Sequence, residues 1–289
     1  MNFQDFYQKG RPQFSFEIFP PKNEAGFQDL LAAMKELSCL HPAFISVTYG
    51  AMGSTQALTR DLALRIHREL GLTTAFHFTC VGSDRESIQN YVEQLKKEGL
   101  HLIVALRGDP PEGTKEFVPK EDGFRYAAQL VRFLKELGGF SIAVAGYPEG
   151  HVEAPDPETD LINLKLKVQA GADIVITQLF FDNQDFFNFQ NRARQIGIKV
   201  PVIPGIMPIV NLKQIEKITR MCGARVPEAL HEKLLRNESD PEAIREIGIQ
   251  HAILQCRELI ERGSPGIHFY TLNKAYSVGK VVRALPFPP

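Results

Sequence analysis

Apolar residues along the chain gather in eight short and nearly continuous runs rich in Val, Ile, Phe and Thr. Continuous runs of this length, without strict alternation, are typical of strands that are buried on both faces. They predict strands at 14–20, 44–50, 74–81, 102–109, 141–148, 173–180, 201–206 and 266–272. Helical patterns between them predict helices at 26–37, 57–70, 84–98, 123–137, 158–170, 183–197, 211–221 and 273–284.

Capping residues support several of these helices. Asp84 precedes one of them as a side-chain cap and Gly99 closes it. Asp156-Pro157 opens another, with proline at the first helical position, and Gly171 ends it. These helices therefore have predicted ends as well as predicted faces.

Eight strand–helix units in succession predict an α/β fold of the (β/α)8 (TIM) barrel type. The segment 227–262 predicts two extra helices inserted between strands 7 and 8, the second starting at Ser239-Asp240-Pro241. No linker-like or low-complexity tract divides the chain, so we expect one domain over 1–289. The alternative is an open doubly wound sheet, but the Gly-x-Gly-x-x-Gly sequence common in that fold is absent.

Composition excludes several classes of protein. The 289 residues are 44% hydrophobic and 23% charged, with a formal net charge of -1, which gives no reason to expect nucleic acid or a membrane surface as partner. We expect no membrane span and no signal peptide, because no long apolar run occurs and the first residues lack a basic and an apolar region. Four scattered cysteines without a Cys-x-x-Cys pair favour a reducing cytoplasm and argue against a metal site.

The stretch Phe14–Pro21 holds the first candidate for chemistry. Glu17 lies within this apolar strand, between Phe16 and Ile18. A carboxylate in such surroundings is costly to ionise, so it should have a partner or a raised pKa, as a general acid requires. The alternative is that Glu17 points into solvent from the polar face of the strand, and this stretch alone does not decide between them.

Unusual residues also follow the other predicted strands, at the end of the barrel where such folds carry their sites. They are Thr48, Tyr49, Gly50 and Ala51; His77, Thr79 and Cys80; Arg107, Gly108 and Asp109; Tyr147, Glu149 and His151; Gln178; Gly205; and Tyr270, Thr271 and Asn273. Each alone is weak evidence, since a single histidine is more often a core residue. Together they predict a large pocket with aromatic and hydrogen-bonding walls.

Cationic residues at two strand ends suit a phosphorylated ligand. Arg107, His151, Asn163 and Lys167 could hold a diphosphate through charge-assisted hydrogen bonds. Asn163 and Lys167 are four residues apart and share a helix face. From spacing alone, however, Lys167 fits better in a solvated stripe with Lys165.

Eight motifs, in order over nearly the whole chain, resemble the bacterial type of methylenetetrahydrofolate reductase. They are SFEIFPPK at 15–22, SVTYGA at 46–51, LRGD at 106–109, YPEGH at 147–151, DLINLK at 160–165, ITQLFFD at 176–182, IPGIMP at 203–208 and HFYTLN at 268–273. The resemblance implies a single-domain barrel with noncovalent FAD at the C-terminal face. It implies a ping-pong reaction, in which NADH or NADPH reduces the flavin and 5,10-methylenetetrahydrofolate is then reduced to 5-methyltetrahydrofolate. It also implies a homo-oligomer, and leaves no room for the C-terminal regulatory domain of eukaryotic relatives.

The resemblance also implies roles for particular residues. Glu17 matches the general acid that protonates folate N10, while flavin N5 supplies the hydride. Asp109 matches an aspartate beside the flavin, which would favour hydride donation and stabilise a substrate cation. The matching FAD contacts are Tyr49, Ala51, His77, Arg107, Gly108, Asp109, Tyr126, Ala127, Tyr147, His151, Ala154, Asp160, Asn163 and Lys167, with Thr48 on the nicotinamide side. The matching substrate contacts are Gln178, Gln214, Tyr270 and Lys274.

Three positions depart from the pattern of bacterial relatives. Leu166 replaces an arginine that contacts FAD, and Lys274 replaces a substrate-contacting arginine, which keeps the charge but loses the planar fork. Ile218 stands where an aromatic residue packs against nicotinamide nucleotide or folate. The last difference favours, as an alternative, a reductase that receives electrons from a protein donor.

Two rival functions fit a barrel of this kind. An aldolase or phosphosugar enzyme would need a Schiff-base lysine or a metal-ligand cluster, and no predicted strand interior carries a lysine. A noncatalytic flavin-binding subunit would keep the pocket, and replacing Glu17 would then change nothing. The presence of both Glu17 and Asp109 favours the enzyme.

Overall fold

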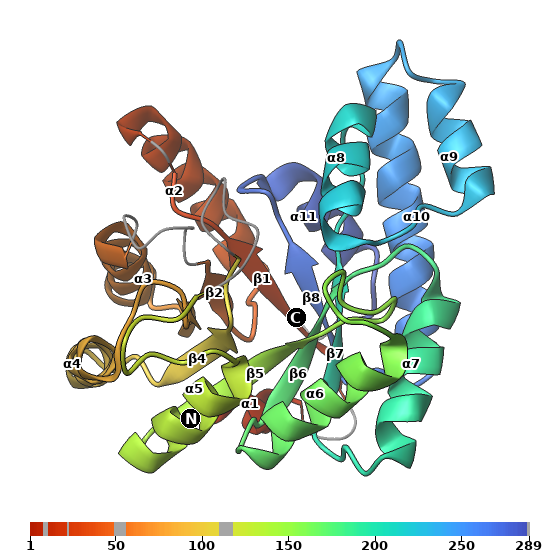
Figure 1. Cartoon of the computed structure of the whole chain (residues 1–289). Helices are drawn as coiled ribbons and strands as arrows, with labels where there is room; N and C mark the ends of the chain where they lie inside the picture. Colours follow the sequence, from red (N-terminus) through yellow and green to blue (C-terminus); the bar gives the residue numbers. More distant parts are fainter. Residues whose placement is uncertain (8–10, 22, 49–55, 110–117, 288–289) are drawn as a thin grey trace.

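The computed structural model describes residues 1–7, 11–21, 23–48, 56–109 and 118–287. Eight parallel strands form a closed barrel in chain order, with helices around it (Figure 1). The strands are β1 (Gln13–Ile18), β2 (Ile45–Val47), β3 (Thr74–Thr79), β4 (Leu102–Leu106), β5 (Ser141–Gly146), β6 (Ile174–Leu179), β7 (Val202–Ile206) and β8 (Gly266–Tyr270). All eight predicted strands are confirmed, although most end one to three residues earlier than their apolar runs predict.

Helices follow the strands as predicted. They are α2 (Glu24–Ser38), α3 (Gln56–Leu70), α4 (Arg85–Lys97), α5 (Ala127–Leu137), α6 (Pro157–Gln169), α7 (Asn183–Gln195), α8 (Leu212–Cys222), α9 (Glu228–Leu235), α10 (Pro241–Glu261) and α11 (Ala275–Arg283). The predicted caps are present: Asp84 accepts a hydrogen bond from the Ser87 N–H, and Asp156 accepts one from the Thr159 N–H. None of the described helices is long and apolar enough to cross a membrane.

Three helices lie between β7 and β8, and two of them, α9 and α10, occupy the segment 227–262 as predicted. Packing shows which of the three covers the barrel. The predicted seventh barrel helix, α8, packs with α9 in a separate apolar cluster that includes Leu212, Ile215, Leu230 and Leu234. Instead α10 contacts β7, α7 and α11 and contributes to the main core through Ile249. Figure 1 shows α8 and α9 standing above the barrel beside the upper end of α10. The extra elements are therefore α8 and α9, which border the carboxyl ends of the strands.

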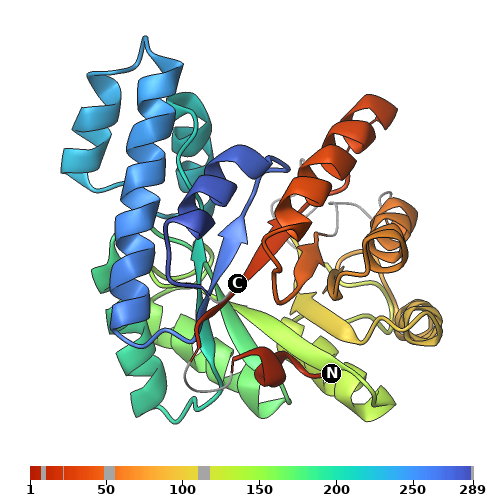
Figure 2. The same ribbon diagram turned by 180° about the vertical axis from the view of Figure 1, so that it is seen from behind.

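The apolar interior is split into two layers by the strands. One layer joins the outward strand side chains to the helices and contains Phe16, Phe76 and Phe269. The other fills the barrel itself and contains Ala75, Val104, Ala143 and Ile203 among others. A short helix that the sequence analysis missed, α1 (Phe3–Phe6), closes the amino end of the barrel; in the rear view it lies below the strands, near the N-terminus (Figure 2). Phe3 of this helix is fully buried in the interior cluster.

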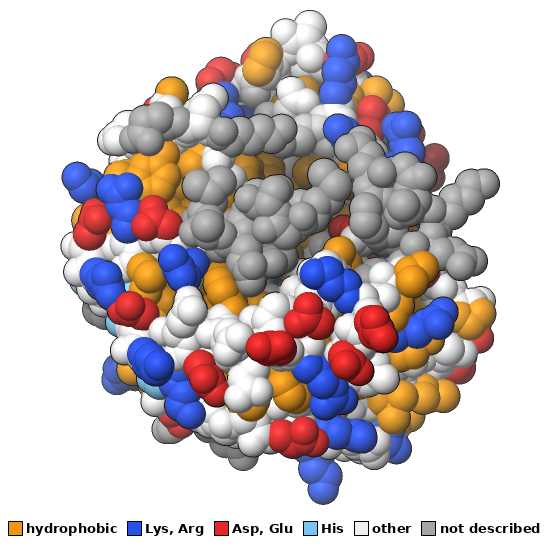
Figure 3. Space-filling model, turned by 60° about the vertical axis from the view of Figure 1, so that its left-hand side comes forward, with side chains coloured by type: hydrophobic (Ala, Val, Ile, Leu, Met, Phe, Trp, Pro, Cys, Tyr) orange, Lys and Arg blue, Asp and Glu red, His pale blue; other side chains and the backbone are white. Residues whose placement is uncertain are grey.

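The outer surface shows no preference for one sign of charge on the face in Figure 3. Acidic and basic side chains alternate there, as the near-neutral formal charge leads one to expect. Charge therefore marks no binding site on this face, and the candidate residues lie instead at the carboxyl ends of the strands.

Candidate active site

Glu17 lies near the carboxyl end of β1, between two histidines of the barrel interior. The parallel register places it beside Ser46 of β2 and Tyr270 of β8. Its Oε2 atom is 3.3 Å from Nε2 of His268, which must donate because the carboxylate only accepts. The same oxygen is 3.3 Å from Nε2 of His77 in β3. The Glu17 side chain is 19% exposed, so it faces the barrel mouth and not bulk solvent.

These partners decide the protonation of Glu17. Burial raises its pKa, but the two nearby imidazoles of His77 and His268 outweigh burial and lower the pKa to about 2. The sequence offered three interpretations of Glu17: a partner, a raised pKa or a solvent-facing carboxylate. The partner is confirmed, and the other two are wrong. Both histidines lie far from Glu17 along the chain, in β3 and β8, so the local sequence around Glu17 could not reveal them.

Two polar atoms beside Glu17 are buried without a hydrogen-bond partner in the described part of the chain. They are Nε2 of His77, which is at ion-pair distance from Glu17 but not aligned for a hydrogen bond, and Oγ of Ser46. Unpaired buried polar atoms are rare in native proteins and mark places where a ligand or water supplies the partner. The floor of the barrel mouth thus fits a ligand with polar atoms of its own.

The segment after β4 forms one wall of the mouth. Arg107 makes a two-pronged ion pair with Glu153, with N–O distances of 2.5 and 2.7 Å, and this pairing raises its pKa. Gly108 has φ +85°, and a Cβ there would lie 2.8 Å from a methyl group of Val81. Asp109 follows with an exposed side chain. The wall thus presents a cation, a close backbone approach and a carboxylate in three consecutive residues.

The segment after β5, with α6, forms the adjoining wall. Nζ of Lys167 donates a 2.6 Å hydrogen bond to the Ala145 carbonyl and lies 5.7 Å from the ring centre of Tyr147. Burial lowers the pKa of Lys167 to about 8, against the opposing effect of Asp160. Burial in turn raises the pKa of Asp160. The assignment of Lys167 to a solvated stripe is therefore wrong, because the side chain turns inward to the barrel mouth.

The same wall carries an aromatic pair. The rings of Tyr147 and His151 meet edge to face with centres 4.6 Å apart, and His151 Nδ1 accepts a hydrogen bond from the Glu153 N–H. Burial, followed by the charge of Arg107, lowers the pKa of His151. Neutral His151 thus has its Nε2–H as a hydrogen-bond donor.

Other expected cofactor contacts are spread along the rim. Tyr126 and Asn163 are exposed, Ala127 and Ala154 are half-buried, and the Thr48 carbonyl accepts a hydrogen bond from Thr59. Tyr49 and Ala51 lie outside the described residues. Leu166 is 49% exposed on α6, so the position where relatives are expected to carry arginine faces solvent here.

The ends of β6 and β8 hold the expected substrate contacts. The Tyr270 hydroxyl donates a 2.7 Å hydrogen bond to the Thr177 carbonyl, and burial raises its pKa well above the usual range. Gln178 accepts a hydrogen bond from the Leu179 N–H through Oε1. Ile218 is half-buried in the apolar cluster of α8 and α9.

Two other strand-end residues serve the fold. The Thr271 hydroxyl donates to the Glu17 carbonyl at 2.7 Å. Asn273 accepts from the Phe19 N–H at 2.9 Å and donates to the Phe19 carbonyl at 2.7 Å. These bonds fasten the end of β8 to the end of β1, which fixes the position of Glu17. Both residues therefore have a structural role.

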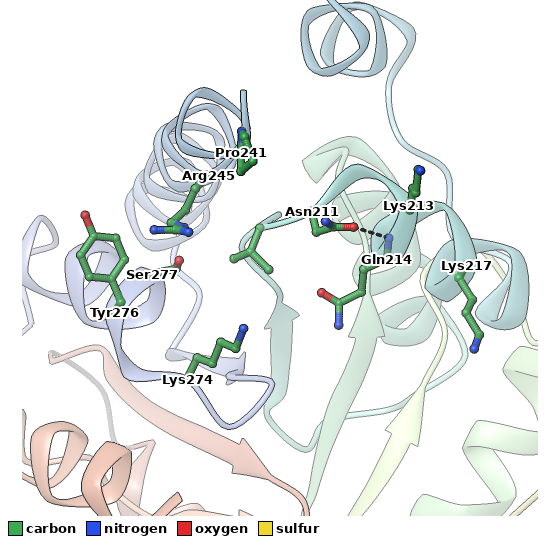
Figure 4. Close-up of a pocket in the computed structure, with 10 residues that line it drawn as sticks. Asn211, Lys213, Gln214, Lys217, Pro241, Arg245, Lys274, Tyr276 and Ser277 are labelled. Atoms are coloured by element: carbon green, nitrogen blue, oxygen red, sulfur yellow. Dashed lines mark hydrogen bonds between the residues drawn. The ribbon is translucent and has the colours of Figure 1, made fainter. Parts of the chain in front are cut away.

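A cavity of ≈ 860 Å³ opens beside the mouth, between α8, α10 and α11 (Figure 4). Its walls include four cationic residues, Lys213, Lys217, Arg245 and Lys274, together with Gln214. Lys274 and Gln214 point into the same gap in Figure 4. The structure thus brings these two expected substrate contacts together, about a cavity suited to an anion.

Sequence reasoning missed Ser15 and gave His268 no role. His268 donates to Glu17 through Nε2, and its Nδ1 lies 2.7 Å from the Ser15 hydroxyl. Ser15 is two residues before Glu17, so the period of a strand places both side chains on the barrel side. That spacing is a signal from which Ser15 could have been found.

Comparison with known proteins identifies the family. A sequence model described as methylenetetrahydrofolate reductase matches residues 2–286. The 5,10-methylenetetrahydrofolate reductases of Pectobacterium carotovorum and Escherichia coli are 40% and 38% identical, each over 92% of this chain and 88% of their own. "Methylenetetrahydrofolate reductase (NADH) 1" of Zea mays is 39% identical over 97% of this chain. The chain spans about half the length of the plant relatives it matches, 51% in the maize protein.

A solved structure shows the same fold at low identity. It is an uncharacterized protein from Clostridium thermocellum described as binding two copies of 5-methyl-5,6,7,8-tetrahydrofolic acid, with a TM-score of 0.63 and 13% identity over 97% of this chain and 96% of its own. The family match over nearly all residues, with the closed parallel barrel, gives one conclusion. This chain belongs to the methylenetetrahydrofolate reductase family.

Proposed function

We propose that the chain is a flavin-dependent reductase that converts 5,10-methylenetetrahydrofolate to 5-methyltetrahydrofolate with electrons from NADH or NADPH in a ping-pong reaction. The observation that carries this proposal is Glu17, held between His77 and His268 at the floor of the barrel mouth. Family membership supplies the reaction, and the site supplies a carboxylate and imidazoles where a proton must be handled.

The walls of the mouth fit noncovalent FAD. Lys167, His151 and Arg107 supply hydrogen-bond donors, two of them charged, which suits a diphosphate. The backbone at Gly108 permits a close approach that a side chain would obstruct. The unpaired Nε2 of His77 provides a further polar partner at the floor. When bound, FAD would supply hydride transfer chemistry, and the protein would supply position and protons.

We assign to Glu17 the role of donating a proton to the substrate. In this proposal the bound cofactor and substrate exclude water from the carboxylate, which raises its pKa, and Glu17 then delivers a proton to folate N10 as the five-membered ring opens. The hydrogen bond from Thr271 to the Glu17 carbonyl holds β1 in place. Asp109 adds a negative charge at the rim, which stabilises the cation that ring opening leaves on the substrate. We propose Tyr270, which lies beside Glu17 in the strand register, and Gln178, at the end of β6, as substrate contacts.

The cationic cavity beside the mouth suits the carboxylates of a folate. Lys274 and Gln214 face its interior, with Arg245 on the opposite wall. A lysine forms a point-charge contact where an arginine would form a fork, so we expect weaker directional binding at Lys274 than in relatives with arginine.

Two rapid-mixing reactions test the proposal. The first mixes the FAD-loaded protein with NADH or NADPH and follows flavin reduction; the second mixes the reduced protein with 5,10-methylenetetrahydrofolate and follows flavin reoxidation. Glu17→Gln should slow the second reaction at least 100-fold and leave the first within about threefold. Equal rates of reoxidation for the variant and the wild type would refute the role of Glu17. Reduction by neither nucleotide, with reoxidation intact, would favour the protein donor that Ile218 suggested.

A further inference from the structure

Arg225 lies in the connection between α8 and α9 and contacts acidic residues of two other segments. Its backbone N–H and its Nε atom donate to the Glu149 carboxylate at 3.0 and 2.9 Å. Glu149 follows β5, between Tyr147 and His151 of the wall that fits the cofactor. Nη2 of Arg225 donates to the carboxylate of Asp185, in the first turn of α7, at 3.3 Å. We call Glu149, Asp185 and Arg225 the rim clamp.

The acidic members of the rim clamp are more buried than the arginine. The side chains of Glu149 and Asp185 are 7% and 23% exposed, whereas that of Arg225 is 75% exposed. Burial raises the pKa of Glu149, the hydrogen bond from Arg225 opposes that effect, and the charge of Asp185 adds to it. The guanidinium offsets the repulsion of the two carboxylates. An exposed arginine adds little to stability by itself, so the clamp chiefly fixes how the segments after β5 and α8 lie against α7.

The two ends of α8 are held in different ways. Its buried residues, Leu212 and Ile215, lie in the amino-terminal half. At the other end Met221 is 69% exposed. Gly223 ends the helix with φ +78°, and its backbone comes so close to the β5 segment that a Cβ would lie 2.8 Å from a methyl group of Val152. The rim clamp follows directly and is the polar tie between this end of α8 and the β5 segment.

α8 also carries part of the cavity that suits the carboxylates of a folate. Gln214 and Lys217 line this cavity from α8, and Gln214 points into its gap (Figure 4). Lys274 reaches the same gap from the position before α11. Gln214 moves with α8 and Lys274 does not, so the spacing of these two contacts depends on where α8 stands.

Resting on the proposed function, we propose that Arg225 is a positioning residue for the folate substrate. Through its two carboxylate partners it holds α8 where Gln214 and Lys274 reach the same substrate molecule. Arg225 itself does not touch the substrate, and no proton or hydride passes through it. The rim clamp therefore governs how tightly the folate binds, whereas Glu17 on β1 governs how fast it reacts.

Rapid mixing of the reduced, FAD-loaded protein with a series of 5,10-methylenetetrahydrofolate concentrations separates binding from chemistry. Arg225→Gln should raise the half-saturating folate concentration about 10-fold and leave the limiting rate of flavin reoxidation within about threefold. Arg225→Lys keeps the charge and the backbone hydrogen bond but loses the planar fork, so it should raise that concentration only about threefold. Arg236→Gln is the matched control, because Arg236 is 77% exposed and pairs with Glu232 one turn earlier. It should change neither quantity.

A double variant distinguishes positioning from a purely structural role. Arg225→Gln alone leaves the buried Glu149 carboxylate without its guanidinium, which by itself costs stability. Combining it with Glu149→Gln removes that charge, so the double variant should unfold at nearly the denaturant concentration of the wild type. Its half-saturating folate concentration should nevertheless stay about 10-fold higher than that of the wild type, because the tie to α8 is still missing. Recovery of both quantities in the double variant would overturn the inference.

A second readout needs neither flavin nor folate. Amide hydrogen exchange in the FAD-free protein should be about 10-fold faster at the carboxyl-terminal end of α8 in Arg225→Gln, and unchanged in Arg236→Gln. Unchanged exchange in α8, or an unchanged half-saturating concentration in Arg225→Gln, would overturn the inference and leave the proposed function standing. A wild type that the folate does not reoxidise would overturn the proposed function, and the exchange rates would still decide whether the clamp holds α8.

Discussion

Lys167 offers a test in which stability and binding should change in opposite directions. Burial lowers its pKa from 10.5 to about 8. At 1.36 kcal/mol for each pKa unit, holding this ammonium in place costs the folded protein about 3 kcal/mol at neutral pH. Replacing Lys167 with methionine removes that cost and loses the hydrogen bond to Ala145, worth about 1 kcal/mol. We expect Lys167→Met to stabilise the FAD-free protein by about 2 kcal/mol.

The gain should depend on pH with a definite sign. Because the folded-state pKa of this base lies below its unfolded value, the unfolded chain binds more protons between about pH 8 and 10.5. The cost of the ammonium is fully present below pH 8 and is lost as pH rises through that window. The advantage of Lys167→Met should therefore shrink above pH 8 and vanish or reverse near pH 10.5.

Denaturant unfolding of FAD-free protein at pH 7, 9 and 10.5 measures this gain, and a fluorescence titration measures FAD affinity. Lys165→Met on the same helix is the matched control, and should change stability by less than about 0.5 kcal/mol. Lys167→Met should also weaken FAD binding about 10-fold by removing a charge-assisted hydrogen bond. A variant that is less stable than the wild type at pH 7 would refute the account of Lys167.

Three further predictions concern residues that hold the site in shape. Gly108→Ala should lower the free energy of unfolding by roughly 2–4 kcal/mol, because its φ is +85° and the added Cβ would lie 2.8 Å from a methyl group of Val81. Gly150→Ala, with φ +87° but open space around it, should lower the free energy of unfolding by only about 1 kcal/mol in the same assay. Asn273→Ala should lose about 1–2 kcal/mol of stability with its two bonds to Phe19, while FAD affinity in a titration stays unchanged. The difference in free energy of unfolding between the wild type and Glu17→Gln should narrow as pH falls from about 4.5 to about 2, because the carboxylate becomes protonated in that range. A difference that stays constant in acid unfolding curves would contradict the low pKa of Glu17.

The strands were predictable because burial on both faces produces continuous apolar runs. The places of α8 and α10 were not, because two amphipathic helices in succession both offer an apolar face. Only packing shows that Ile249 of α10 meets the barrel core while Leu212 of α8 joins a separate cluster. The sequence thus predicted that these helices exist, but not which elements each of them packs against.

The candidate site was likewise predictable only in part. Glu17 could be singled out because a carboxylate in an apolar strand is unusual. Its low pKa, however, depends on His77 and His268, and His268 is 251 residues away along the chain. Lys167 looked solvated because spacing along a helix fixes a face but does not show how that face meets β5. Long-range contacts of these kinds become visible only in the fold.

The measurement that tests the central proposal most directly is the visible spectrum of the purified protein, taken after incubation with FAD and removal of excess cofactor. Under anaerobic conditions NADH and NADPH are added in parallel, followed by 5,10-methylenetetrahydrofolate. We expect a bound oxidised-flavin spectrum that one nucleotide bleaches and that the folate restores, with 5-methyltetrahydrofolate as product. A protein that retains no flavin, or a reduced flavin that the folate leaves unchanged, would contradict the assignment.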